Sequence, residues 1–69
     1  MPNMKIEVNG HTREFATGIR LAEVLDAEGL AGRRVAIEVN RTLVPRSQHG
    51  SHVLSDGDRV EIVQAMGGG

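Results

Sequence analysis

The pattern that most constrains this fold is a strand followed at once by a tight turn. In residues 4–8, apolar and charged side chains alternate, the period of two expected of a β-strand with one buried face. Asn9-Gly10 comes next and favours a type I′ hairpin turn, because both central positions of that turn need a positive φ. We therefore expect residues 11–16 to return antiparallel, with Phe15 opposite Met4 on the core face.

The spacing of apolar residues then changes from two to about 3.6. Leu21, Val24 and Leu25 predict a helix with one apolar stripe. Gly29 is suited to end the helix, because glycine takes the left-handed conformation at little cost. The start is less regular, since Arg20 occupies the position where Ser, Thr or Asp normally caps the first turn.

Three further strands are expected in the second half of the chain. Residues 34–39 alternate again, residues 42–44 form a short strand that Pro45 ends, and residues 59–63 form the last strand. Before the last strand, Val53-Leu54 is expected to anchor a polar loop to the core, and a Ser-Asp-Gly-Asp sequence at residues 55–58 predicts a tight turn.

The order strand, strand, helix, strand, strand, strand predicts an α+β fold with one helix packed on one face of a mixed sheet of four to five strands. This is the β-grasp, or ubiquitin-like, layout. A right-handed crossover allows the last strand to lie beside the first in the middle of the sheet. We expect residues 1–63 to form this domain and residues 64–69 to form a flexible tail ending in Gly-Gly.

Composition excludes several classes of function. A net charge of −1 gives no basic field for a phosphate backbone, and the single aromatic residue, Phe15, leaves little on which bases could stack. The sequence contains no apolar run of about 20 residues, so a membrane role is not expected. The absence of cysteine removes thiol nucleophiles and fits a reducing compartment. We expect a soluble, cytoplasmic protein.

Two histidines and two aspartates in the second half raise the question of a metal site. His49 and His52 are three residues apart, with Asp56 and Asp58 close by. Three ligands in register are not evident, and the spacing is not that of a calcium loop. We therefore interpret the histidines as solvated loop residues and the aspartates as turn residues, and expect no metal or cofactor to be bound by this chain.

The closing Gly67-Gly68-Gly69 is the feature with the clearest chemical meaning. Glycines allow a tail to enter a narrow channel, and an α-carboxyl with an ordinary pKa of about 3.3–3.7 is ionised at neutral pH. Met66 is a suitable apolar anchor for such a tail. The alternative interpretation is an ordinary frayed chain end.

Four stretches of the chain resemble the ThiS-type sulfur carriers of thiamine biosynthesis, relatives of the molybdopterin-synthase small subunit and of ubiquitin. The resemblance covers nearly the whole chain. It is carried by residues 35–40 (Val-Ala-Ile-Glu-Val-Asn), 44–46 (Val-Pro-Arg), 54–63 (Leu-Ser-Asp-Gly-Asp-Arg-Val-Glu-Ile-Val) and 65–69 (Ala-Met-Gly-Gly-Gly).

The resemblance implies a protein cosubstrate and not an enzyme. Its Gly69 carboxylate would be adenylated by a ThiF-like adenylating enzyme, which uses ATP and magnesium, and then converted to a thiocarboxylate with sulfur from a persulfide protein. A ThiG-like thiazole synthase would receive the sulfur during thiazole-ring formation. In this interpretation Met66, Gly67 and Gly68 are held by the partner enzymes.

The partner surface beyond the tail is expected near the last strand. Arg59, Glu61 and Arg46 are candidates, because a partner that holds the tail must also meet the sheet from which it leaves, although an ordinary solvated face explains them equally well. Two other functions stay open at this point. One is a sulfur carrier for molybdopterin, an amino acid or tRNA thiolation, and the other is a non-covalent binding domain of the same fold.

Overall fold

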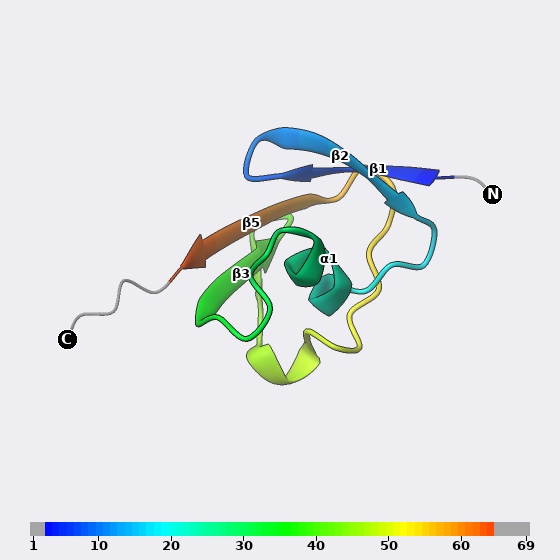
Figure 1. Cartoon of the computed structure of the whole chain (residues 1–69). Helices are drawn as coiled ribbons and strands as arrows, with labels where there is room; N and C mark the ends of the chain where they lie inside the picture. The colour runs from blue at the N-terminus through cyan, green and yellow to red at the C-terminus, as the bar shows by residue number, and fades with distance from the viewer. Residues whose placement is uncertain (1–2, 65–69) are drawn as a thin grey trace.

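The computed structural model describes residues 3–64 as a five-stranded mixed sheet with an α-helix on one face (Figure 1). The strands lie in the order β2-β1-β5-β3-β4, with β1 and β5 parallel and the other neighbours antiparallel. The predicted β-grasp topology is therefore confirmed, with the last strand beside the first. The elements are β1 (Asn3–Val8), β2 (His11–Ala16), α1 (Leu21–Ala27), β3 (Val35–Val39), β4 (Thr42–Val44), the 3₁₀ helix η1 (Arg46–Gln48) and β5 (Arg59–Gln64).

The first hairpin has the predicted turn and register. Asn9 and Gly10 have φ values of 48° and 84°, as a type I′ turn requires. Met4 pairs with Phe15 across β1 and β2. Met4 is buried in the core and Phe15 packs against it, so the hairpin closes one side of the hydrophobic layer.

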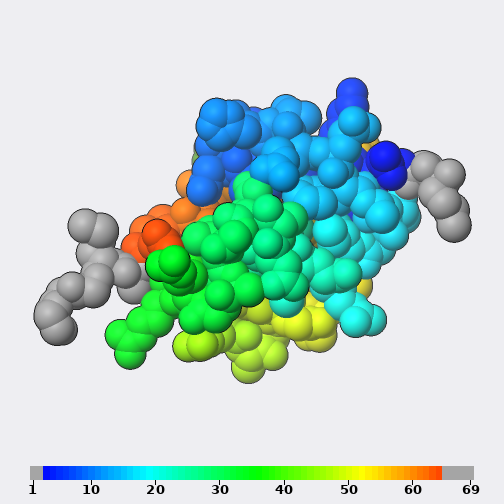
Figure 2. Space-filling view, viewed as in Figure 1, coloured from blue at the N-terminus to red at the C-terminus, as the bar shows by residue number. Residues whose placement is uncertain are grey.

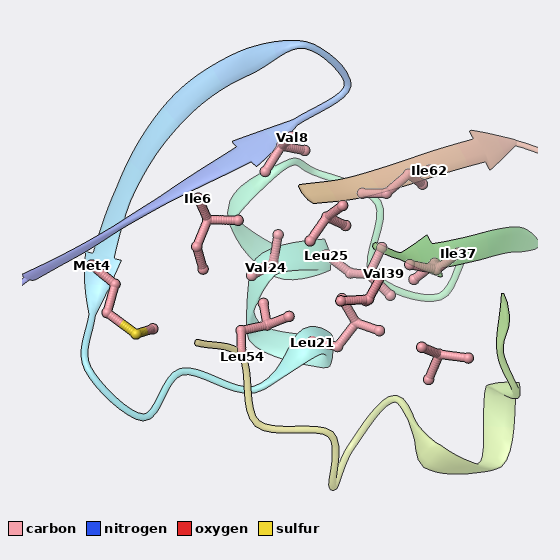
Figure 3. Packing of buried hydrophobic residues seen from close by; sticks show 12 residues of the cluster. Met4, Ile6, Val8, Leu21, Val24, Leu25, Ile37, Val39, Leu54 and Ile62 are labelled. Carbon is pink, nitrogen blue, oxygen red and sulfur yellow. The ribbon is translucent and has the colours of Figure 1, made fainter. Parts of the chain in front are cut away.

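The core lies between α1 and the inner face of the sheet (Figure 3). Leu21 and Val24 of the helix and Ile37 of β3 have no exposed surface. Seen from the helix side in Figure 2, α1 and the residues after it (cyan to green) fill the space between the β1–β2 hairpin (blue) and the segment after β4 (yellow-green). The buried apolar residues are Met4, Ile6, Val8, Leu21, Val24, Leu25, Ile37, Val39, Val44, Leu54, Val60 and Ile62.

The start of α1 is satisfied by backbone groups of a distant loop. Arg20 is the N-cap residue and provides no side-chain cap. The amides of the first two helical residues donate instead to the carbonyl oxygens of His52 and His49, each at 2.9 Å. The Arg20 amide donates to Oε1 of Glu23 at 2.9 Å. Because these bonds satisfy donors that a helix leaves unpaired, the helix can begin at Leu21 without Ser, Thr or Asp at the N-cap position.

The end of α1 confirms the prediction for Gly29. Gly29 follows the C-cap residue and has a φ of 74°. Its amide donates to the Asp26 carbonyl at 3.0 Å, and the Leu30 amide donates to the Leu25 carbonyl at 2.8 Å. These two bonds form a Schellman motif. Leu30 packs against the core, so the chain turns back over the helix before β3.

Two predictions for the segment between β4 and β5 are wrong. His49 is buried, with 8% of its surface exposed, and its Nε2 lies 3.0 Å from the Val44 carbonyl oxygen. It is not a solvated loop residue, because η1 turns the chain beneath the start of α1. Val53 is 54% exposed and does not anchor the loop, whereas Leu54 is buried. Val53 instead forms an isolated β-bridge with Arg20, which directs its side chain away from the core.

His49→Ala is expected to destabilise the domain by about 1–3 kcal/mol, because it removes the partner of a buried carbonyl and leaves a cavity. Urea denaturation monitored by circular dichroism measures this change. His11→Ala, at the exposed start of β2, is the matched control and is expected to stay within about 0.5 kcal/mol of the unaltered protein. Equal stabilities of the two variants would show that the His49 contact contributes nothing.

Candidate functional site

The candidate site begins where β5 ends. β5 continues to Gln64, which pairs with Val35 of β3, one residue beyond the predicted end of the strand. In Figure 1 this end lies on the opposite side of the molecule from the start of β1. The predicted tail residues Met66, Gly67, Gly68 and Gly69 lie outside the described residues 3–64. The roles of these residues stay predictions. The structure describes β5, the strand that precedes them in the chain.

β5 is fixed on both sides along its first half. Arg59 and Val60 pair with β1, and all of β5 from Val60 to Gln64 pairs with β3. Asn9, the first turn residue after β1, extends the pairing on the β1 side: the Ile62 amide donates to Asn9 Oδ1 at 2.7 Å, and Asn9 Nδ2 donates to the Ile62 carbonyl at 3.3 Å. The Asn9 side chain therefore acts as one more backbone unit of β1.

The last two residues of β5 are paired on one side only within the described part of the chain. Val63 pairs with Ala36 and Gln64 pairs with Val35, both in β3. The pairing with β1 stops at Val60, and the contact from Asn9 reaches only Ile62. The backbone that leads to the tail is therefore held by β3 and open on its other edge.

The turn before β5 sets where the strand begins. Gly57 has a φ of 85°, and the Lys5 amide donates to Asp56 Oδ1 at 2.8 Å. The two carboxylate oxygens of Asp58 accept hydrogen bonds from the Ser55 amide at 2.8 Å and from Asn40 Nδ2 at 2.9 Å. The predicted tight turn is confirmed. Residues 3–64 contain no group of three His, Cys, Asp or Glu side chains that could hold a metal ion.

The structure brings together two of the three predicted surface residues. Arg59 and Glu61 alternate with the buried Val60 and Ile62, so both are exposed on the outer face of β5. Arg59 Nε lies 2.7 Å from Oε2 of Glu7 on the neighbouring strand. Arg46 is exposed but begins η1, outside the sheet. These three residues therefore do not form one patch.

Sequence reasoning missed three residues of the same outer face. Leu43 is 62% exposed and Val63 is 65% exposed, although both are large and apolar. Glu38 lies directly opposite Glu61 in the register of β3 and β5. Alternation within residues 42–44 and 59–64 does place Leu43 and Val63 opposite the buried positions, so the signal was present. The pairing of two glutamates depends on strand register, which periodicity alone does not give.

No helix within residues 3–64 has the length and apolar character needed to span a bilayer.

Comparisons of the sequence with known proteins include the closing glycines. The ThiS family model matches residues 6–69. A thiazole synthase from Paramagnetospirillum magneticum is 38% identical over 66 residues, which cover 96% of this chain and 20% of that protein. The chain thus spans about a fifth of the length of that relative.

Two relatives are similar over their whole length. The sulfur carrier protein ThiS of Escherichia coli is 30% identical over 66 residues, which cover 96% of this chain and 100% of that protein. The crystal structure of the thiamine biosynthesis protein ThiS from Geobacter metallireducens superimposes with a TM-score of 0.80 at 32% identity, covering 96% of this chain and 100% of that one. Sequence and fold therefore agree over nearly the full chain.

Proposed function

This chain belongs to the ThiS family, and from that membership we propose that it is a sulfur carrier of thiamine biosynthesis that carries sulfur on the carboxyl group of Gly69. The observation that carries the proposal is the match of the family through residue 69, which includes the closing glycines. The similarity of the Escherichia coli sulfur carrier over its whole length supports it.

The proposed chemistry needs no side chain of the carrier. The ionised carboxylate of Gly69 attacks the α-phosphorus of ATP, and pyrophosphate leaves to give an acyl-adenylate. The terminal sulfur of a persulfide then attacks the carbonyl carbon and AMP leaves. A thiol cleaves the resulting acyl persulfide, giving a thiocarboxylate and a disulfide. The chain contains no cysteine, so both the persulfide and the thiol belong to partner proteins.

The folded domain supplies a fixed support for this reacting end. β5 lies between β1 and β3, and the side chain of Asn9 secures it as far as Ile62. Five residues follow Gln64, and fully extended they would reach at most about 18 Å. A partner that contacts the domain can therefore position the carboxylate in an active site up to that distance away.

The proposed partners are the proteins that adenylation and sulfur transfer require. A ThiF-like adenylating enzyme would bind ATP and magnesium, and a ThiG-like thiazole synthase would accept the sulfur. The thiazole synthase of Paramagnetospirillum magneticum, a fifth of which is similar to this chain, supports a thiazole synthase as the acceptor. A cytoplasmic location is part of the proposal, and the absence of cysteine from the chain fits a reducing compartment.

A pyrophosphate-exchange assay tests the proposal. The purified chain is mixed with a ThiF-like enzyme, magnesium-ATP and labelled pyrophosphate. The expected result is incorporation of label into ATP that depends on the carrier. A non-covalent binding domain would give no exchange. A carrier for molybdopterin or tRNA thiolation would exchange with the adenylating enzyme of that other route and not with this one.

Met66→Asp is expected to raise the KM for the carrier in this assay about tenfold or more, because it replaces an apolar anchor whose burial contributes about 1.5–3 kcal/mol. The thermal melting temperature is expected to stay the same. Met66→Leu is the matched control and should retain a nearly normal KM. A normal KM for Met66→Asp would exclude Met66 as an anchor.

A further inference from the structure

Two turns of the sheet begin with asparagine and differ in the residue that follows it. Asn9-Gly10 joins β1 to β2, and Asn40-Arg41 joins β3 to β4. The φ values are 48° and 84° in the first turn and 51° and 70° in the second, so all four residues have the positive φ of a type I′ turn. The second turn is therefore a natural comparison for any property that depends on the glycine of the first.

Both asparagine side chains are hydrogen bonded to the segment that contains β5. Asn9 Oδ1 accepts from the Ile62 amide at 2.7 Å, and Asn9 Nδ2 donates to the Ile62 carbonyl at 3.3 Å. Asn40 Oδ1 accepts from the Arg59 amide at 2.9 Å, and Asn40 Nδ2 donates to Asp58 Oδ1 at 2.9 Å. The amide nitrogen of Asn9 is thus held by the longer bond, to a neutral acceptor. Both asparagines are exposed to solvent.

The residue after an asparagine controls a reaction of the asparagine side chain. The backbone nitrogen of that residue gives its proton to hydroxide and attacks Cγ, the Cγ–Nδ2 bond breaks, and ammonia leaves with a proton from water. Water then opens the succinimide ring at either carbonyl, which gives aspartate or isoaspartate. Glycine has no side chain to obstruct the attack, and a Cβ at Gly10 would meet no atom of residues 3–64 within 4 Å. The attack is therefore open at Asn9, whereas the side chain of Arg41 obstructs it at Asn40.

We propose that Asn9 is a site of spontaneous deamidation, and that the loss of its side-chain amide releases the end of β5. Within residues 3–64 the pairing of β1 with β5 stops at Val60, so the Asn9 side chain is what holds Ile62 on that side. A carboxylate has no donor, so its second oxygen would face the Ile62 carbonyl and repel it. Isoaspartate routes the main chain through the former side chain, which lengthens the turn by one atom. Either product weakens the support from which the tail leaves.

Peptide mass spectrometry of the full chain, incubated in mildly alkaline buffer, tests the site. The peptide that contains Asn9 is expected to gain the mass difference between an amide and an acid with time, while the peptide that contains Asn40 stays unmodified. Gly10→Arg is expected to protect Asn9. Arg41→Gly is expected to make Asn40 labile, and because φ at this position suits glycine, this variant should fold. An Asn9 that stays intact, or one that is lost equally fast in Gly10→Arg, would overturn the site.

Hydrogen exchange of the Ile62 amide, measured by NMR, tests the release of β5. In Asn9→Asp, and in the deamidated protein, this amide is expected to exchange about three to ten times faster, which is the effect of losing one hydrogen bond. The unaltered chain, kept at acidic pH where the backbone nitrogen does not lose its proton, is the reference. Unchanged exchange at Ile62 would show that the side-chain amide does not hold the strand, and would overturn this part of the proposal.

Both measurements use the chain alone and are independent of the proposed function. The consequence for sulfur transfer rests on that function. Because a partner that takes the tail must order the end of β5 again, the KM of Asn9→Asp in the pyrophosphate-exchange assay is expected to rise about threefold to tenfold. A normal KM together with faster exchange at Ile62 would refute this consequence. No pyrophosphate exchange by the unaltered chain, together with deamidation at Asn9, would support the site and refute the proposed function.

Discussion

Removal of Gly69 is expected to abolish adenylate formation while the domain folds as before. The deletion moves the reacting carboxylate back by one residue, about 3.3–3.6 Å of extended chain. A displacement of about 1 Å can already cost about 10²-fold in rate, so exchange is expected to fall by at least that factor. Gly69 lies outside residues 3–64, which contain the whole described core, so the melting temperature should not change. Pyrophosphate exchange and a thermal melt measure the two effects.

Gly69→Ala is the control that keeps the length of the chain. Its carboxylate stays at the same reach, so it should be adenylated faster than the deletion variant, and the difference from the unaltered protein measures the need for glycine at the end. Normal exchange by the truncated protein would contradict the assignment of Gly69 as the reacting residue.

Leu21→Ala is expected to lower the free energy of unfolding by about 2–5 kcal/mol, which is a large fraction of the stability of a small domain. Leu21 has no exposed surface and lies at the start of α1 against the sheet (Figure 3). The residues 3–64 contain no disulfide, since the chain has no cysteine, so the core alone must compensate for the loss. Denaturation in urea measures the change, and partial unfolding at room temperature would be consistent with the upper end of this range.

Leu43→Ala makes the same chemical change at an exposed position. Leu43 is 62% exposed on β4, so its stability is expected to stay within about 0.5 kcal/mol of the unaltered protein. If the two leucine variants lost equal stability, the assignment of the core to the helix side of the sheet would be wrong.

The elements of the fold were predictable because each has a local cause. Asn9-Gly10 fixes the first turn, Gly29 ends the helix, and alternation identifies the inner residues of each strand. The order of strands followed from the handedness of the crossover and placed β5 beside β1. These features need only neighbouring residues or a general rule of topology.

The errors arose where distant segments meet. The burial of His49 depends on η1 passing beneath α1. The cap of the helix comes from the His49 and His52 carbonyls, about thirty residues further along the chain. No local pattern contains such contacts. The opposition of Glu38 and Glu61 likewise depends on the register between β3 and β5. Outside the first hairpin, where the two-residue turn fixed Phe15 opposite Met4, the alternation of strand residues predicted their face but not their partner across the strands.

The candidate site likewise has one part with a local cause in the sequence and another part that depends on the assembled sheet. The hypothesis for the tail rests on its composition alone and stays a prediction, because three glycines and a carboxylate have a chemical meaning that does not depend on the fold. The gathering of exposed apolar side chains on the outer face of the sheet could not be predicted, because Leu43, Ala36 and Val63 lie on three different strands. Only the assembled sheet brings them beside the start of the tail.

The mass of the carrier's last residue is the most direct test of the central claim. The chain is incubated with the adenylating enzyme, magnesium-ATP and a persulfide donor, and its C-terminal peptide is then analysed by tandem mass spectrometry. A gain of about 16 Da on Gly69, the difference between sulfur and oxygen, is the predicted result for a thiocarboxylate. An unmodified Gly69 in a reaction that consumes ATP and transfers sulfur would contradict it.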